Sequence, residues 1–123
     1  MTIVCSEEAG IPIKCYSPEL IVYPAIKLVD CDVSSTSFRD FCSANVSSIV
    51  SILARVDSLV IGPGAGRHPM MISTLSQIIT HAVNQNIPLV IDGDGLWVVT
   101  LQPSLIQGYI ASSSPFSLLA RKM

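Results

Sequence analysis

Two glycine-rich loops contain the residues that could do chemistry in this chain. The first, GPGAGR, offers Gly62, Gly64, Gly66 and Arg67 as ligand-facing residues. Glycine lets the backbone approach a ligand closely, and a guanidinium beside free backbone amides can face an anion. The second, DGDG, offers Asp92 and Asp94, whose carboxylates could hold magnesium, order water or bond a sugar hydroxyl. Together the loops could bind a polar small molecule.

Each loop directly follows an apolar strand, and a helix is predicted between them. The two strands are expected over residues 58–61 and 89–91, with Val60 in a buried position. In an open parallel sheet, ligands bind at the carboxyl ends of the strands. The two loops are therefore predicted to form one site.

Both loops also have a purely structural interpretation. Glycine is the ordinary residue of a tight turn, and Asp94 could cap a short helix over residues 96–100. A dinucleotide-binding Rossmann loop is excluded on two counts. That fingerprint needs a further glycine where this chain has Arg67, and its acidic residue should lie closer than Asp92.

The helix between the loops has a clear apolar stripe, of the kind that packs on a sheet. Its members are Met71, Ile72, Leu75, Ile78, Ile79, Ala82 and Val83. Upstream, we expect a strand over residues 2–5, a helix from Ser6 that Pro12 limits to about one turn, and a strand over 20–23 closed by Pro24. Residues 27–37 are expected to be mostly loop, and a helix is expected over 38–56.

Composition indicates a single small domain. The chain has 123 residues, of which 50% are hydrophobic and 13% charged, which suits strands covered by helices on both faces or the interior piece of a larger domain. The net charge of −2 and the lack of a basic cluster argue against a nucleic-acid partner. No apolar run is long enough to cross a membrane, and no secretory leader is visible, so a soluble cytoplasmic protein is expected.

The cysteines and histidines give no metal-site pattern. Cys5, Cys15, Cys31 and Cys42 form no CxxC pair and have no histidine at zinc spacing, so they are interpreted as small core or surface residues. His68 and His81 lack a positioned acid or nucleophile and receive no role.

Four segments in this order resemble the ATP-dependent (S)-NAD(P)H-hydrate dehydratase family. They are SPELIVYP at 17–24, DSLVIGPGAGR at 57–67, IPLVIDGDGLW at 87–97 and QPSLIQGY at 102–109. The resemblance implies a three-layer αβα ribokinase-like fold with a mostly parallel sheet. It assigns 1–109 to the central part of that domain, incomplete at both ends, and leaves 110–123 as a divergent tail.

The resemblance also implies nucleotide repair by a lyase. Family members use ATP and Mg²⁺ to expel the hydroxyl of hydrated NADH or NADPH, because phosphate leaves more readily than hydroxide. By analogy, Gly62, Gly64, Gly66 and Arg67 bind the substrate, while Asp92 and Asp94 support catalysis. Gly93 stands where the family has alanine, which should loosen the loop. A homo-oligomer is implied, and a mitochondrial leader would be compatible with a longer form.

The departures from the family pattern concern the ATP half of the site. The preceding Gly-rich turn, the Thr-Pro-Asn segment and the Gly-Gly-x-Gly-Asp anion hole with its catalytic base have no match here, so we expect no dehydratase activity from residues 1–123 alone. Two alternatives stay open: a non-catalytic truncated isoform that associates with intact subunits, and a ribokinase-like vitamin-precursor kinase. NADH and NADPH forms of the substrate, and ATP and ADP as donor, are all compatible with these residues.

Overall fold

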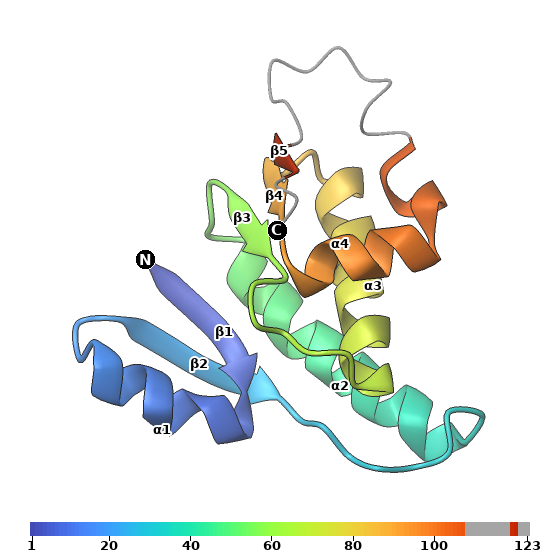
Figure 1. The fold of residues 1–123 in the computed structure, drawn as a ribbon, viewed down its shortest axis with the longest axis horizontal. Helices are drawn as coiled ribbons and strands as arrows, with labels where there is room; N and C mark the ends of the chain where they lie inside the picture. Colours follow the sequence, from blue (N-terminus) through green and yellow to red (C-terminus); the bar gives the residue numbers. More distant parts are fainter. Residues whose placement is uncertain (108–118, 121–123) are drawn as a thin grey trace.

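The computed structural model describes residues 1–107 and 119–120, in which helices alternate with short strands (Figure 1). In chain order the elements are β1 (Thr2–Ser6), α1 (Glu7–Tyr16), β2 (Ile21–Ile26), α2 (Thr36–Leu53), β3 (Leu59–Ile61), α3 (Pro69–Asn84), β4 (Leu89–Ile91), α4 (Asp94–Leu101), the 3₁₀ helix η1 (Pro103–Ile106) and β5 (Leu119–Ala120). The predicted α/β class is confirmed. The predicted boundary after Tyr109 lies outside the described residues.

All strand pairs are parallel, as predicted, but among the described residues they fall into two sheets. One sheet contains β1 and β2, and the other has the order β3-β4-β5. In the second sheet, Val60 lies opposite Val90 and Ile61 opposite Ile91. The two strands that precede the glycine loops are therefore neighbours in register, which brings the loops to the same edge.

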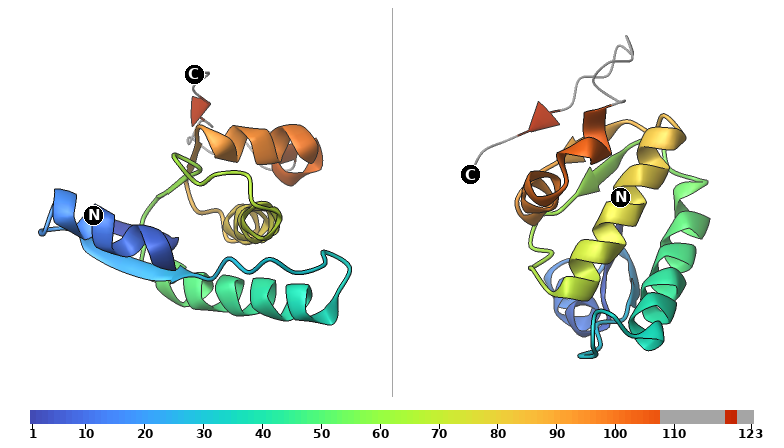
Figure 2. Two further views of the ribbon diagram at one scale, coloured as in Figure 1. Left: turned by 60° about the horizontal axis from the view of Figure 1, so that its bottom comes forward. Right: turned by 90° about the vertical axis from the view of Figure 1, so that its right-hand side faces the viewer.

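Helix α1 is longer than predicted, because it continues through Pro12 to Tyr16. It lies along the β1–β2 sheet (Figure 2), where Gly10 is buried close to Pro24. A proline inside a helix removes one hydrogen bond and strains the preceding turn. Packing against β2 offsets that cost here, so the expectation of a single turn was wrong.

Strand β2 likewise continues through Pro24, where we had predicted its end. The register between β1 and β2 shifts after the pair Val4–Tyr23, before Ser6 meets Ile26. Pro24 therefore lies at an irregularity of an edge strand, the position in a sheet that tolerates a residue without an N–H.

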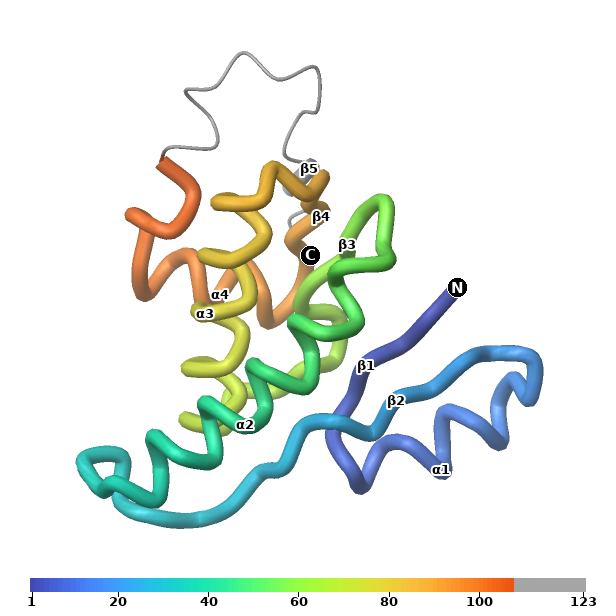
Figure 3. Tube along the Cα trace, turned by 180° about the vertical axis from the view of Figure 1, so that it is seen from behind, coloured from blue at the N-terminus to red at the C-terminus, as the bar shows by residue number. Residues whose placement is uncertain are grey.

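The core lies between the helices and the sheets. Helices α2 and α3 run side by side (Figure 3), and the predicted stripe of α3 is buried at Met71, Leu75, Ile78, Ile79 and Ala82. These side chains pack in one cluster with residues from α2 and from three of the strands. The helix periodicity was therefore interpreted correctly. No helix among the described residues has both the length and the apolar character that a membrane span requires.

Within the described residues no helix covers one face of the β3–β4 pair, contrary to the expectation of strands buried on both faces. Val60 is 61% exposed and its neighbour Val90 is 37% exposed, whereas Ile61 and Ile91 are buried. Side chains alternate between the two faces of a strand. Helices therefore cover only the face that carries the isoleucines, and the predicted burial of Val60 was wrong.

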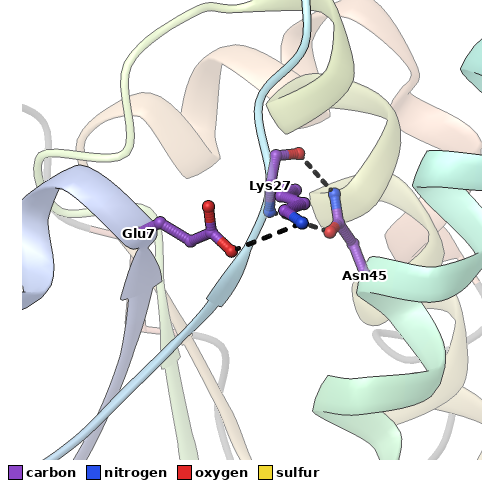
Figure 4. A network of polar contacts seen from close by, with 3 residues as sticks. All are labelled: Glu7, Lys27 and Asn45. Atoms are coloured by element: carbon purple, nitrogen blue, oxygen red, sulfur yellow. Dashed lines mark hydrogen bonds and ion pairs between the residues drawn. The ribbon is translucent and has the colours of Figure 1, made fainter.

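Asn45 joins the end of β2 to α2, as Figure 4 shows. Its side chain is 3% exposed. Its Oδ1 accepts from the Lys27 backbone N–H at 2.9 Å, and its Nδ2 donates to the Lys27 carbonyl at 2.9 Å. The Lys27 ammonium also lies 3.9 Å from the Glu7 carboxylate, but both side chains are more than half exposed, so this ion pair adds little. The amide therefore fixes where the chain leaves the first sheet.

Asn45→Ala is expected to lower the free energy of unfolding by about 1–3 kcal/mol, because two backbone groups of Lys27 lose their partner. Urea denaturation measures the change. The matched control is Ser48→Ala on the exposed side of the same helix, with an expected effect within about 0.5 kcal/mol. Equal losses in the two variants would contradict this role of Asn45.

Candidate functional site

The two glycine loops meet at the end of the β3–β4 pair, as the sequence predicted. The Asp92 N–H donates to the Ile61 carbonyl at 3.0 Å, which extends the pairing one residue beyond the strands. The second loop then turns at once into α4, since the Gly95 N–H donates to the Asp92 carbonyl at 3.0 Å. Figure 1 shows the chain after β3 passing beside the start of α4.

Gly62 is required by this meeting of the two loops. A Cβ at residue 62 would lie 2.2 Å from the Asp92 carbonyl oxygen and 2.2 Å from the Gly95 nitrogen, and its φ is +110°. Gly95, in the second loop, also has no room for a side chain, because a Cβ there would lie 2.7 Å from the Ile61 carbonyl oxygen. The space beside Gly62 is therefore filled by the backbone of the second loop.

Gly64 and Gly66 differ from Gly62 in what surrounds them. Both have positive φ, +66° and +77°, and no atom lies within 4 Å of a Cβ built at either one. The turn is closed internally, because the Ala65 N–H donates to the Gly62 carbonyl at 3.0 Å. These two glycines therefore give the loop its shape while leaving open space above the backbone.

Asp94 binds the first loop to the second. Its Oδ2 accepts from the Gly66 N–H at 2.8 Å, and its Oδ1 lies 3.5 Å from Nε of Arg67. The predicted capping role was wrong: Gly93 occupies the cap position with φ +51°, and Asp94 is the first residue of α4. The predicted arrangement of a guanidinium beside backbone amides that face an anion is present, and within the described residues that anion is the Asp94 carboxylate.

Trp97 also contacts Arg67, so that Arg67, Asp94 and Trp97 form one cluster. The sequence analysis gave Trp97 no role. The Arg67 guanidinium carbon lies 4.1 Å from the centre of the Trp97 ring, within the range of a cation–π contact. Asp94 and Trp97 are three residues apart on α4, a spacing that places two side chains on one helix face. That spacing was the signal available in the sequence.

A surface hollow of about 440 Å³ lies at the cluster of Arg67, Asp94 and Trp97. It is lined by Gly64, Arg67, Gly93, Asp94, Leu96, Trp97 and Thr100. Its size falls within the range of small-molecule sites. Three of the six predicted site residues, Gly64, Arg67 and Asp94, thus line the hollow, and Gly66 is joined to them through its hydrogen bond to Asp94.

Asp92 stands apart from the hollow. Its Oδ1 accepts from the Gly93 N–H at 2.8 Å, and no bond to Oδ2 is found within the described residues. In the same part of the chain, no three histidine, cysteine or acidic side chains gather at a distance that would hold a metal ion.

His68 caps helix α3 and ties it to the segment between β2 and α2. Its Nδ1 accepts from the Met70 N–H at 3.1 Å, so the ring proton lies on Nε2, which is 3.1 Å from Oδ1 of Asp30. The imidazole thus satisfies one of the free N–H groups at the helix start. Its role is structural, and it fixes the backbone directly after Arg67.

His68→Ala is expected to lower the free energy of unfolding by about 0.5–2 kcal/mol, the usual cost of losing an N-cap. Thermal and urea unfolding followed by circular dichroism measure the change. The exposed Gln77→Ala on the same helix is the control, and a loss no larger than its own would show that the cap contributes nothing.

Hydrogen bonding and burial shift the pKa of two groups that lie outside the lining of the hollow. Hydrogen bonds from the backbone and side chain of Ser34 lower the pKa of Asp32, in the turn before α2. Burial raises the pKa of the Cys5 thiol. The described cysteines form no disulfide, and Cys42 is the buried one, packed with Phe38 and Met70.

Comparison with known proteins places both loops inside the region that one family model matches. The sequence model of a family described as NAD(P)H-hydrate dehydratase matches residues 1–112. Proteins named ATP-dependent (S)-NAD(P)H-hydrate dehydratase are 40% identical in Batrachochytrium dendrobatidis, 39% in Vitis vinifera and 40% in Danio rerio. Each match covers 87% of this chain but 34%, 30% and 28% of the respective relative. The chain therefore spans about a third of the length of these relatives.

Proposed function

The chain belongs to the NAD(P)H-hydrate dehydratase family, and we propose that it forms part of the substrate side of an enzyme that restores NADH or NADPH from the hydrated form. The observation that carries this proposal is the hollow at the two glycine loops. It lies in the matched region and contains Arg67, which Asp94 and Trp97 hold in place. Relatives matched over this region carry the dehydratase name.

The proposed reaction proceeds in two balanced steps. The hydroxyl added to the nicotinamide ring attacks the terminal phosphorus of ATP and loses its proton, and ADP leaves. The ring carbon–oxygen bond, whose oxygen now carries the phosphoryl group, then breaks, phosphate leaves with the electron pair, and loss of a proton from the adjacent ring carbon forms the ring double bond. The products are reduced cofactor, ADP and phosphate. In such a transfer the protein mainly positions the groups and neutralises phosphate charge.

The described residues contribute positioning in this scheme. Arg67 is the cation that lines the hollow, and its charge is already paired with Asp94. We therefore propose that the positive charge that stabilises the transferring phosphate, including Mg²⁺ carried by ATP, comes from outside the hollow. Asp92, with its second carboxylate oxygen unbonded within the described residues, is the side chain placed to contact that ion.

The test uses the longest product of the same gene, mixed with ATP, Mg²⁺ and hydrated NADH. The proposal predicts one ADP and one phosphate for each reduced cofactor formed, with no product when ATP is omitted. Residues 1–123 alone are expected to give no turnover, because no residue among them matches the family's anion hole or its catalytic base. Phosphorylation of a vitamin-precursor alcohol without any action on hydrated NADH would instead identify a kinase of the same fold and would defeat the proposal.

A further inference from the structure

His68 joins the end of the first glycine loop to the segment between β2 and α2 through both nitrogens of its ring. Nδ1 accepts from the Met70 N–H at 3.1 Å, and Nε2 lies 3.1 Å from Oδ1 of Asp30. Asp30 and His68 are 38 residues apart in the sequence, so no local pattern pairs them. The imidazole, which is 28% exposed, is therefore held between two separate parts of the chain.

The segment that carries Asp30 is itself packed on the protein. Val29 and Cys31 flank Asp30, and both pack against a small buried cluster. That cluster includes Phe38 of α2 and Met70, the second residue of α3. The Asp30 side chain is fully exposed, so its contact with the imidazole adds little to overall stability. Because its two neighbours are packed, the carboxylate nevertheless stands at a defined place beside the start of α3.

Both ring nitrogens of His68 are occupied, which leaves the side chain no lone pair for proton transfer. A neutral imidazole has one donor and one acceptor nitrogen. Nδ1 accepts from a backbone N–H, so Nε2 carries the proton and donates to Asp30. The ring also lies outside the described lining of the hollow. Its effect on the site is therefore transmitted through the backbone to its chain neighbour, Arg67.

We propose that Asp30 and His68 are positioning residues for Arg67. The carboxylate fixes the imidazole, the imidazole fixes the turn into α3, and Arg67 directly precedes that turn. The guanidinium is thereby kept 4.1 Å from the centre of the Trp97 ring, with its Nε 3.5 Å from Oδ1 of Asp94. The inference rests on the proposed function, in which Arg67 contacts the substrate, and it adds two residues that act on the substrate only through Arg67.

Two substitutions break this contact while leaving the start of α3 capped. Asp30→Ala removes the carboxylate and leaves the bond between His68 and the Met70 N–H. His68→Asn introduces a preferred N-cap residue that has no atom at the position of Nε2. The matched control is Asp40→Ala, which removes an exposed carboxylate on α2 and changes the net charge as Asp30→Ala does.

The first measurement is steady-state kinetics of the longest product of the same gene. Asp30→Ala and His68→Asn are each expected to raise KM for hydrated NADH roughly fivefold, the upper end of what an exposed charged contact contributes. We expect kcat to stay within about twofold of the wild type, because a misplaced Arg67 weakens binding and not the chemical step. The double variant should lose no more than either single variant, since both break one contact. Asp40→Ala should leave both constants within about twofold.

The second measurement needs neither ATP nor substrate. Trp97 is the single tryptophan of the chain, so its indole N–H gives one nuclear magnetic resonance signal that reports on the Arg67 guanidinium beside it. Asp30→Ala and His68→Asn are expected to shift this signal in the full 123-residue chain, whereas Asp40→Ala should leave it in place. A purely structural role would lower the unfolding midpoint without moving the signal of the folded state.

An unshifted Trp97 signal in both folded variants, or an equal shift in Asp40→Ala, would overturn the inference. A KM that neither substitution changes, in an enzyme whose wild type is active, would overturn it as well. A wild type without turnover would instead defeat the proposed function, and the Trp97 signal would still decide whether Asp30 and His68 position Arg67.

Discussion

Gly62→Ala is expected to destabilise the chain by about 3–5 kcal/mol, the largest effect of any single substitution in the two loops. The added Cβ would lie 2.2 Å from two backbone atoms of the second loop, and φ at this residue is +110°. Backbone atoms cannot move aside as a flexible side chain can. The β3–β4 end would therefore have to open, and α4 would lose its contact with the first loop.

Gly64→Ala is the matched control for this prediction. It adds the same methyl group two residues away, at a positive φ of +66° but with no atom within 4 Å. Its expected cost is only the left-handed backbone term, about 1–2 kcal/mol. Guanidinium denaturation of both variants measures the difference, and similar midpoints for the two would show that the loops do not pack as described.

Arg67→Ala in the longest product of the same gene is expected to lower kcat/KM for hydrated NADH by roughly 100-fold, the size of effect that misplacing a substrate can have. The guanidinium lines the hollow and is held there by Asp94 and Trp97. Removing it takes away both a hydrogen-bond donor and one wall of the site.

Arg55→Ala is the control for Arg67→Ala. Arg55 is an exposed arginine just beyond α2 and outside the lining of the hollow, so its removal changes the net charge equally. We expect its kcat/KM within about twofold of the wild type, as for an exposed residue remote from the substrate. Comparable losses for the two arginines would mean that overall charge, and not the hollow, determines the rate.

Elements whose apolar residues repeat at a regular spacing were predictable from the sequence. The stripe of α3 has a helical spacing long enough to exclude a strand, and its positions are buried as expected apart from Ile72 and Val83, which are half-buried. The end of α1 and the length of β2 were not predictable, because Pro12 and Pro24 are tolerated only through packing and a register shift that involve other strands. Local rules on proline do not include these tertiary contacts.

Within the site, the sequence identified the loops but not the partners inside them. The alternation of glycine and aspartate after two apolar strands predicted their meeting. It could not show that Asp94 bonds Gly66 and Arg67 instead of capping its own helix, since 28 residues separate the Gly66 amide from that carboxylate. Trp97 was missed for the same reason: its contact with Arg67 depends on how α4 lies across the end of the sheet.

The most direct test of a single site built from two loops is a double-mutant cycle in the longest product of the gene. The rate of ATP-dependent NADH recovery from hydrated NADH is measured for the wild type, Arg67→Ala, Asp94→Ala and the double variant. Because the Asp94 carboxylate lies 3.5 Å from Nε of Arg67, we predict that the double variant loses about as much activity as either single variant. Losses that simply add would contradict a shared site, and a wild type without ATP-dependent recovery would contradict the proposed activity itself.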